Sequence, residues 1–157
     1  PIMKSPQKQY FHHIIFICLL MVVGWGQEYY KNGQIKYEIN DKDGKEIYYF
    51  ENGQIRIKKN YRDGKRDGKD IWYYENGHIG WEENWEDGKI EGRWTYYYED
   101  GGIRMERNYK DGKRVGKEIW YYKNGQISYE GNYKDGKEIG KWTYLNEDGS
   151  LKKVEEF

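Results

Sequence analysis

The sequence predicts an all-β protein: an elongated, single-layer antiparallel β-meander built from 24-residue β-hairpin repeats, after an N-terminal signal helix. The 157 residues include no alanine and only four leucines, so helical bundles and coiled coils are excluded. Aromatic residues make up 18% of the chain, including 18 tyrosines and 7 tryptophans, and such residues favour strands. Disorder is not expected, because 27 basic residues balance 27 acidic ones and rings are abundant.

Residues 1–26 have the layout of a secretory signal peptide. Two lysines precede an apolar run at residues 14–23, and the small residues Gly24 and Gly26 follow it. The run is too short for a membrane-spanning helix of about 20 residues. We therefore expect cleavage after Gly26 and export to the periplasm, the cell surface or the medium. An uncleaved anchor is the alternative, with membrane contact only through residues 10–26.

The remaining chain, residues 27–157, has no cysteine, since the single Cys18 lies inside the apolar run. Disulfides and thiol chemistry are therefore excluded from it. Without residues 1–26, 25 basic residues face 27 acidic ones. A nucleic-acid partner is not expected, because no basic excess is present to neutralise phosphates.

Turn signals recur at a fixed interval and define about five repeats within residues 27–157. Asn-Gly or Asp-Gly pairs end at glycines spaced by 20 and then 24 residues: Gly33, Gly53, Gly77, Gly101, Gly125 and Gly149. A second series of Asp-Gly-Lys loops follows 11 residues later, and a third glycine follows each complete loop by four: Gly68, Gly92, Gly116 and Gly140. We expect a ring such as that of Tyr133 to lie over these last glycines.

The first turn series predicts two-residue type I′ hairpins, which need positive φ at both central residues. This turn sets the cross-strand pairs Trp120–Tyr129, Glu118–Gly131, Trp72–Trp81, Tyr96–Met105 and Trp94–Arg107. Nearer the turns it sets Tyr122–Ile127, Tyr74–Ile79 and Tyr98–Ile103. One face of the sheet is then aromatic and forms the core by ring packing. The other face is mixed and mostly polar, and one of its rows is Lys36, Arg56, Gly80, Arg104 and Ser128. Neighbouring strands add to it Ile71, Tyr73, Thr95, Tyr97, Ile119 and Tyr121.

The last copy departs from the others as an end cap would, over residues 145–157. Asn146 replaces the usual tyrosine, Lys153 is expected opposite Tyr144, and the final residues are charged. Charges on an edge strand oppose pairing with another chain.

The stretch YEGNYKDGKEIGKW, from Tyr129, resembles the MORN repeat. The longer unit GKEIWYYKNGQISYEGNYKDGK is more similar to the bacterial variant of that repeat, found in proteins often labelled antitoxin components. The resemblance covers residues 28–157 and implies a β-hairpin ribbon that serves as a binding surface. The chain departs from the MORN pattern where a histidine is usual, at Asp67, Glu91, Val115 and Ile139, and it keeps the mid-strand glycine only at Gly131.

A second resemblance concerns residues 141–151, KWTYLNEDGSL, which are similar to aromatic cell-wall-binding repeats of Gram-positive surface proteins. That resemblance implies aromatic cages for choline or glycans. The recurrent DGKxxGK loop is absent from those repeats, which favours the MORN interpretation.

Few residues could carry catalysis or bind a metal. Residues 27–157 contain one histidine, His78, in a turn, and two serines, neither in a nucleophile-elbow context. The DKDG at residues 41–44 is explained by turn chemistry without calcium. We therefore expect no catalytic residue, no cofactor and no metal, and the protein is not expected to be an enzyme.

The sequence favours an exported, non-enzymatic repeat protein that binds a protein partner or a cell-envelope component. The alternatives are a glycan- or choline-binding cell-wall module and an antitoxin-like neutraliser of a toxin. The candidate partner-binding residues lie on the aromatic face: Trp72, Trp81, Trp85, Trp94, Tyr96, Trp120, Tyr129 and Trp142.

Overall fold

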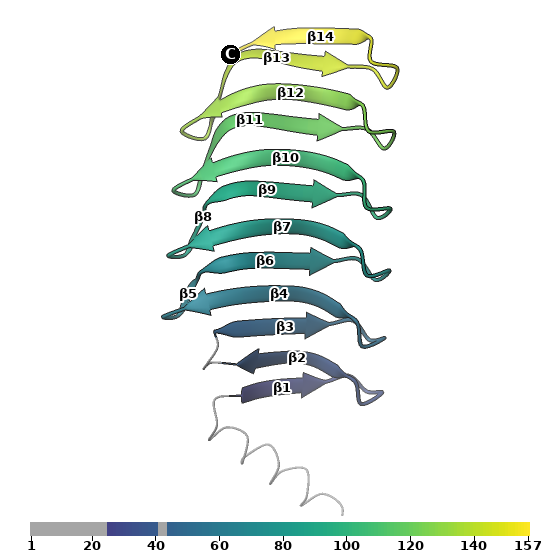
Figure 1. Ribbon diagram of the computed structural model, residues 1–157, viewed down its shortest axis with the longest axis vertical. Coiled ribbons are helices and arrows are strands. Elements are labelled where there is room, and N and C mark those ends of the chain that lie inside the picture. The colour runs from purple at the N-terminus through teal and green to yellow at the C-terminus, as the bar shows by residue number, and fades with distance from the viewer. Residues whose placement is uncertain (1–24, 41–43) are drawn as a thin grey trace, which may run out of the picture.

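The computed structural model describes residues 25–40 and 44–157, which form one open antiparallel β-sheet (Figure 1). The predicted all-β meander is confirmed. Nearly all of the predicted signal peptide lies outside the described residues, as do three residues of the DKDG stretch. The described part contains no helix, and therefore none long and apolar enough to cross a membrane.

The strands follow one another across the sheet in chain order (Figure 1). Twelve of them form the path: β1 (Trp25–Tyr29), β2 (Ile35–Asn40), β3 (Lys45–Tyr49), β4 (Ile55–Arg62), β6 (Gly68–Tyr73), β7 (Ile79–Glu86), β9 (Gly92–Tyr97), β10 (Ile103–Lys110), β11 (Lys113–Tyr121), β12 (Ile127–Lys134), β13 (Lys137–Leu145) and β14 (Leu151–Glu156). The two-residue strands β5 (Lys65–Arg66) and β8 (Lys89–Ile90) pair with β4 and β7.

The first strand begins at Trp25, before the predicted cleavage site. Trp25 pairs with Asn40, and Gly26 pairs with Ile39. Cleavage after Gly26 would therefore shorten β1 by two residues and leave the end of β2 without these partners.

The Asn-Gly turns are not the predicted type I′ turns. At Asn124-Gly125, the Gly125 N–H donates to Tyr122 O at 2.9 Å, and the Tyr122 N–H donates to Gln126 O at 2.7 Å. Gly125 has φ 84°, whereas Asn124 is not among the residues with positive φ. This is a three-residue loop in which the glycine forms a bulge.

The type I′ geometry belongs to the Asp-Gly-Lys loops instead. Asp111 and Gly112 have φ 52° and 78°, and Lys110 pairs directly with Lys113 across them. Asp63, Asp87 and Asp135 also have positive φ. The type I′ prediction was therefore wrong for the Asn-Gly turns, and this geometry occurs in the second series of turns, for which no turn type was predicted.

The three-residue loop shifts the pairs next to each Asn-Gly turn by one residue. The inner pairs are confirmed: Trp120–Tyr129, Glu118–Gly131, Trp72–Trp81, Tyr96–Met105 and Trp94–Arg107. Beside the turns, however, the isoleucines pair one residue earlier, as Tyr73–Ile79, Tyr97–Ile103 and Tyr121–Ile127. These residues therefore lie on the face opposite the tryptophans, because neighbouring residues of a strand point to opposite sides.

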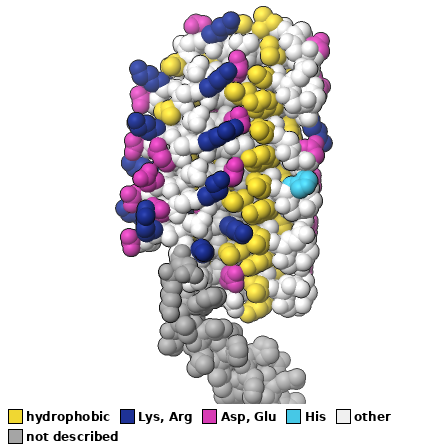
Figure 2. All heavy atoms as spheres, viewed as in Figure 1, with side chains coloured by type: hydrophobic (Ala, Val, Ile, Leu, Met, Phe, Trp, Pro, Cys, Tyr) yellow, Lys and Arg dark blue, Asp and Glu magenta, His cyan; other side chains and the backbone are white. Residues whose placement is uncertain are grey.

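The sheet consequently has two faces with apolar stripes. The aromatic face carries the row Tyr48, Ile57, Trp72, Trp81, Tyr96, Met105, Trp120, Tyr129 and Tyr144. The other face, seen in Figure 2, is the tyrosine–isoleucine face. Its hydrophobic stripe runs the length of the ribbon beside a column of basic and acidic side chains. Lys117 and Glu130 form an ion pair on this face, with 2.8 Å between Nζ and Oε2. The predicted mostly polar face is therefore only partly polar.

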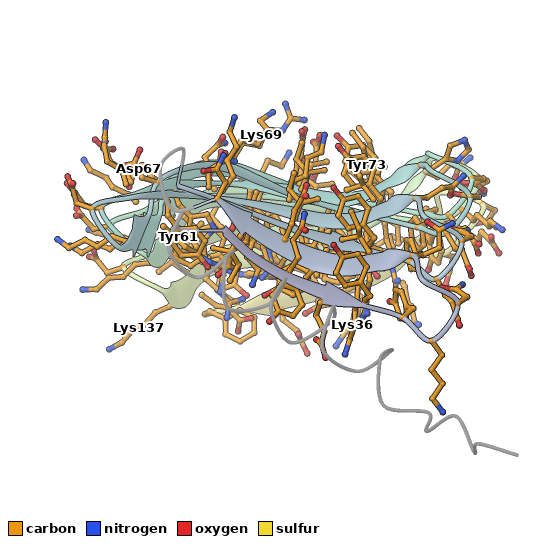
Figure 3. The ribbon with its side chains drawn as sticks, turned by 90° about the horizontal axis from the view of Figure 1, so that it is seen from below. Lys36, Tyr61, Asp67, Lys69, Tyr73 and Lys137 are labelled. Atoms are coloured by element: carbon orange, nitrogen blue, oxygen red, sulfur yellow. The ribbon has the colours of Figure 1, made fainter. Side chains whose placement is uncertain are left out.

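The bulges also move the row predicted for the polar face. Two consecutive residues of a bulged strand can point to the same side. The guanidinium of Arg104 lies 5.1 Å from the ring centre of Tyr96, and a Cβ on Gly80 would meet the Trp72 ring. Figure 3 shows Lys69 and Tyr73 on one side of the sheet and Tyr61 and Lys36 on the other. The row of Lys36, Arg56, Gly80, Arg104 and Ser128 was therefore assigned to the wrong face.

The third glycine series does not lie under rings. Gly116 pairs with Tyr133, but nothing lies within 4 Å of the place a Cβ would take, and its φ is 66°. Positive φ, not ring packing, explains glycine here. Rings cover Gly80 and Gly131 instead.

The core is thin and aromatic, as predicted for a single layer. Met105 and Trp142 are 1% and 2% exposed, and Tyr133 packs edge-on against Trp142 at 5.2 Å between ring centres. The predicted pair of Lys153 with Tyr144 is confirmed. The Phe157 ring also packs edge-on against Trp142, at 6.0 Å between ring centres.

Candidate functional site

A groove of about 360 Å³ opens on the aromatic face near the middle of the ribbon. It crosses β6, β7, β9, β10 and β11, and its walls are Trp72, Trp81, Trp94, Tyr96, Met105, Arg107 and Trp120. Met105 is buried, whereas the aromatic residues around it are only partly buried. The groove therefore presents ring surface to solvent above an aliphatic floor.

Two features shape the groove at its Trp72 end. A Cβ on Gly80 would lie 1.8 Å from an atom of the Trp72 ring, so only glycine lets that ring lie across β7. The Tyr74 ring packs edge-on against Trp72, with 4.6 Å between ring centres. The Trp72 ring is thus held from two directions.

Arg107 and Glu118 organise the Trp120 end. The Arg107 guanidinium stacks over Trp94, 4.7 Å from its ring centre, and Arg107 Nε lies 3.1 Å from Glu118 Oε2. Trp120 Nε1 donates to Glu118 Oε1 at 2.8 Å. Glu118 is 3% exposed, so a buried carboxylate fixes the positions of a cation and a tryptophan that both line the groove.

Arg104 stands beside the groove without a carboxylate partner among the described residues. Its guanidinium lies 5.1, 5.5 and 5.9 Å from the ring centres of Tyr96, Tyr98 and Trp120. These contacts are cation–π stacking, which leaves the positive charge uncompensated by an anion. The groove therefore carries a positive charge at one side.

A second buried charge cluster lies on β6 and β7, two positions along from the Trp72–Trp81 pair. Asp70 and Glu83 face each other across β6 and β7, and Arg66 Nη1 lies 3.4 and 3.5 Å from their oxygens. Asp70 is fully buried and Glu83 is 8% exposed. Burial raises the pKa of each carboxyl above its ordinary value, although Arg66 opposes the shift.

Five of the eight sequence-predicted residues meet in the groove: Trp72, Trp81, Trp94, Tyr96 and Trp120. The other three do not line it. Trp85 is covered by Arg66 at 4.6 Å and donates to Glu83, Tyr129 stacks on the outer side of Trp120 at 5.5 Å, and Trp142 is buried. Trp142 is therefore a core residue.

Met105 and Arg107 also line the groove and were not predicted from the sequence, although their partners across the strands were. Arg104 was assigned to the wrong face. A signal for Met105 was present, because it interrupts a row that is otherwise mostly tyrosine and tryptophan. No sequence signal distinguished the face of Arg104, since that depends on a bulge.

The arrangement supports stacking and charge recognition. His78 lies in an Asn-Gly turn, where its Nδ1 contacts Glu99 O at 2.8 Å. Among the described residues, no group of three potential metal ligands occurs. The groups beside the groove hold one another in place, and they offer ring faces and a guanidinium to a ligand.

The sequence matches a known family over much of its length. The profile described as the MORN repeat variant matches residues 26–40, 42–63, 90–111 and 114–135, together just over half of the chain. The chain belongs to the MORN repeat variant family. The matched segments cover nearly all of the hairpins β1–β2, β3–β4, β9–β10 and β11–β12. The MORN-like resemblance found in the sequence is confirmed.

Residues 64–89 of this MORN-repeat protein are not matched, yet they form the same kind of hairpin, β6–β7. This segment supplies Trp72 and Trp81, and the adjoining matched repeats supply the remaining groove residues. The groove therefore lies where a diverged repeat meets regular ones.

Solved structures resemble the fold only distantly. They include accessory secretory protein 1, 2 and 3 of Streptococcus pneumoniae (17% identity, TM-score 0.37, 68% of this chain and 20% of that chain) and TarM (13%, 0.34, 99% and 24%). The GtfA/B complex bound to UDP and GlcNAc is a third (14%, 0.30, 83% and 26%). The chain spans about a quarter or less of each. No curated protein matches it.

Proposed function

We propose that this MORN-repeat protein is an exported, non-enzymatic binding protein that holds a protein partner in the groove of its aromatic face. The observation that carries the proposal is the position of the groove. On a repeated surface, a specific partner needs one place that differs from the rest. The groove, where residues 64–89 join the regular repeats, is such a place.

The physical character of the groove supports binding rather than catalysis. Partly exposed tryptophan and tyrosine rings provide large contact areas at low entropic cost, and such residues dominate binding energy at protein interfaces. Arg107 and Glu118 pair with each other, so the buried charges hold the rings in place and need no substrate to satisfy them.

Site-specific photo-crosslinking tests this proposal with a control one residue away. Tyr96 lies in the groove, and Tyr97 is on the tyrosine–isoleucine face of the same strand. A benzoylphenylalanine at position 96 should give one adduct of defined mass in the native host. That adduct should be lost when Trp120→Ala is added. Equal labelling from positions 96 and 97, or labelling from 97 alone, would contradict the proposal.

The competing function is a choline- or glycan-binding module. The guanidiniums of Arg104 and Arg107 stand over the rings that a choline cage would use, and like charges repel a quaternary ammonium. Titration of tryptophan fluorescence with choline and with chito-oligosaccharides compares the two functions. A saturable quench that is lost in Trp94→Ala would support the small-ligand module and refute a protein partner for the groove.

Export is supported by the sequence of residues 1–26 and is tested separately. Protein recovered from the periplasm, the cell surface or the medium should begin at Gln27. A chain that stays in the cytosol with residues 1–26 intact would contradict export while leaving groove binding open to its own test.

A further inference from the structure

A row of positions next to the Asn-Gly turns crosses the sheet and passes the groove at Gly80 and Arg104, which contact the groove residues Trp72, Tyr96 and Trp120. Equivalent positions of successive repeats hold Lys36, Arg56, Gly80, Arg104, Ser128 and Lys152, so the row contains four cations and no acid. Among the described residues, Lys36 is paired with Glu28 at 3.2 Å. The two arginines of the row lack such a partner.

These two arginines differ from the other described arginines. Each of the other five has a carboxylate within ion-pair distance. Arg56 instead stacks over Phe50 at 5.9 Å, and Arg104 stacks over Tyr96, Tyr98 and Trp120. Both guanidiniums therefore lie on the aromatic face with an uncompensated charge.

The spacing of the two arginines fits an extended peptide. β4 and β10 are four strand steps apart in the sheet, so Arg56 and Arg104 are separated by about 19 Å at ~4.8 Å per step. An extended chain advances about 3.3 Å per residue, so some six residues cover this span. Residues i, i+2, i+4 and i+6 of such a chain face the same side.

We propose that the groove binds an extended acidic peptide segment that places carboxylates on Arg56 and Arg104 and apolar side chains over the tryptophans between them. The segment has the form acid-x-apolar-x-apolar-x-acid. Gly80, midway between the arginines, lets the Trp72 ring lie across β7, and this partly exposed ring is available to the apolar side chains. This inference rests on the proposed function and adds the chemistry of the partner.

The inference is tested by calorimetric titration of the full chain with heptapeptides whose two ends are blocked. The first probe is Asp-Ser-Phe-Ser-Leu-Ser-Asp, and its controls replace both Asp by Asn or by Lys, or Phe and Leu by Ser. The Asp peptide should bind most tightly and should weaken as salt is added, because the charges are near the surface. Arg104→Gln and Arg56→Gln should each weaken binding about three- to fivefold.

Arg93→Gln is the matched control. Arg93 lies on β9 and is paired with Glu106 on the tyrosine–isoleucine face, so this change should leave peptide binding unaltered. Arg104→Lys should restore part of the affinity lost in Arg104→Gln. Each variant should keep the wild-type circular dichroism and unfolding midpoint.

Equal binding of the Asp and Asn peptides would overturn the inference, as would an equal loss in Arg93→Gln. Binding of oligogalacturonate but of no peptide would also overturn it, in favour of acidic sugars. If the Asp and Asn peptides bind equally, or if Arg93→Gln loses as much affinity as Arg104→Gln, the crosslink from position 96 can still appear. The proposed function then survives. Loss of that crosslink with intact Arg104-dependent peptide binding would instead refute the proposed function.

Discussion

At Gly131 a missing side chain determines how the core packs. A Cβ there would lie 2.1 Å from an atom of the Trp142 ring, and Trp142 is 2% exposed. Gly131→Ala should therefore lower the free energy of unfolding by about 1–3 kcal/mol, because the ring must move within a filled site. Urea denaturation measures the change. Gly102→Ala, where the new Cβ meets only ordinary contacts, should change stability much less.

The carboxyl groups of Asp70 and Glu83 are the most unusual charges of the sheet. Both are buried, and they share one close cation, Arg66. Asp70 Oδ1 accepts from the Asn60 N–H at 2.8 Å, and Glu83 Oε1 accepts from Trp85 Nε1 at 2.9 Å. Burial still raises the pKa of both groups.

Stability should consequently rise as the pH is lowered from 7.5 to 5. A carboxyl with a raised pKa in the folded state holds its proton more tightly there than in the unfolded chain. Its contribution is therefore lost as pH rises from the ordinary pKa values of 3.8 and 4.5 through the raised ones. Urea unfolding at both pH values measures the effect. Glu83→Gln keeps the acceptor for Trp85 and should flatten the dependence; an unchanged dependence would contradict this explanation.

At the scale of elements, tyrosine hydroxyl groups tie each hairpin to the next. Tyr74, Tyr98 and Tyr122 donate to the backbone oxygens of Tyr97, Tyr121 and Leu145, at 2.9, 2.6 and 2.8 Å. Tyr30 makes the same bond to Tyr49 O in the shorter first repeat. The ladder is interrupted where the equivalent residue is Phe50, which has no hydroxyl group.

Phe50→Tyr should therefore stabilise the protein. The new hydroxyl group would reach Tyr73 O in the pattern of the other repeats and add about 0.5–1.5 kcal/mol to the free energy of unfolding. Thermal unfolding measures the gain. Tyr98→Phe is the reciprocal variant and should lose a similar amount; a neutral Phe50→Tyr beside a destabilising Tyr98→Phe would show that the second repeat is not equivalent.

The strands and their inner pairs could be predicted from the sequence because the alternation of side chains and the turn spacing agree. Trp72 meets Trp81 for this reason. The turn types could not be predicted, because an Asn-Gly pair suits either a two-residue loop or a three-residue loop with a bulge. The difference depends on the φ of the residue before glycine. The three-residue loop places Ile79, Ile103 and Ile127 on the face opposite to the predicted one.

The candidate site could be predicted only in part for the same reason. Five ring residues were found because rings on one face of a sheet are neighbours. The burial of Trp142 could not be predicted, because it depends on Gly131 and on the Phe157 ring. Arg104 was misplaced because its direction follows from a bulge.

At the scale of the whole molecule, the sheet is held together by contacts between neighbouring strands. In the described residues, the main contacts of each strand are with the strands next to it in the sheet. Such a structure can open from its ends without disturbing its middle. Amide hydrogen exchange should be slowest in β9, β10, β11 and β12 and fastest in β1 and β14. Uniform protection over all strands would instead show a single cooperative unit.

Because the repeat is 24 residues long, the number of repeats encoded in the gene sets the length of the ribbon. Each further repeat would add two strands, or about 10 Å of surface, and would bring its own turns, its own rings and its own links to the repeat before it. Duplication of one short stretch of gene can therefore extend the ribbon without redesigning a core. Divergence of one copy, as in residues 64–89, can then distinguish one position along the ribbon from the others.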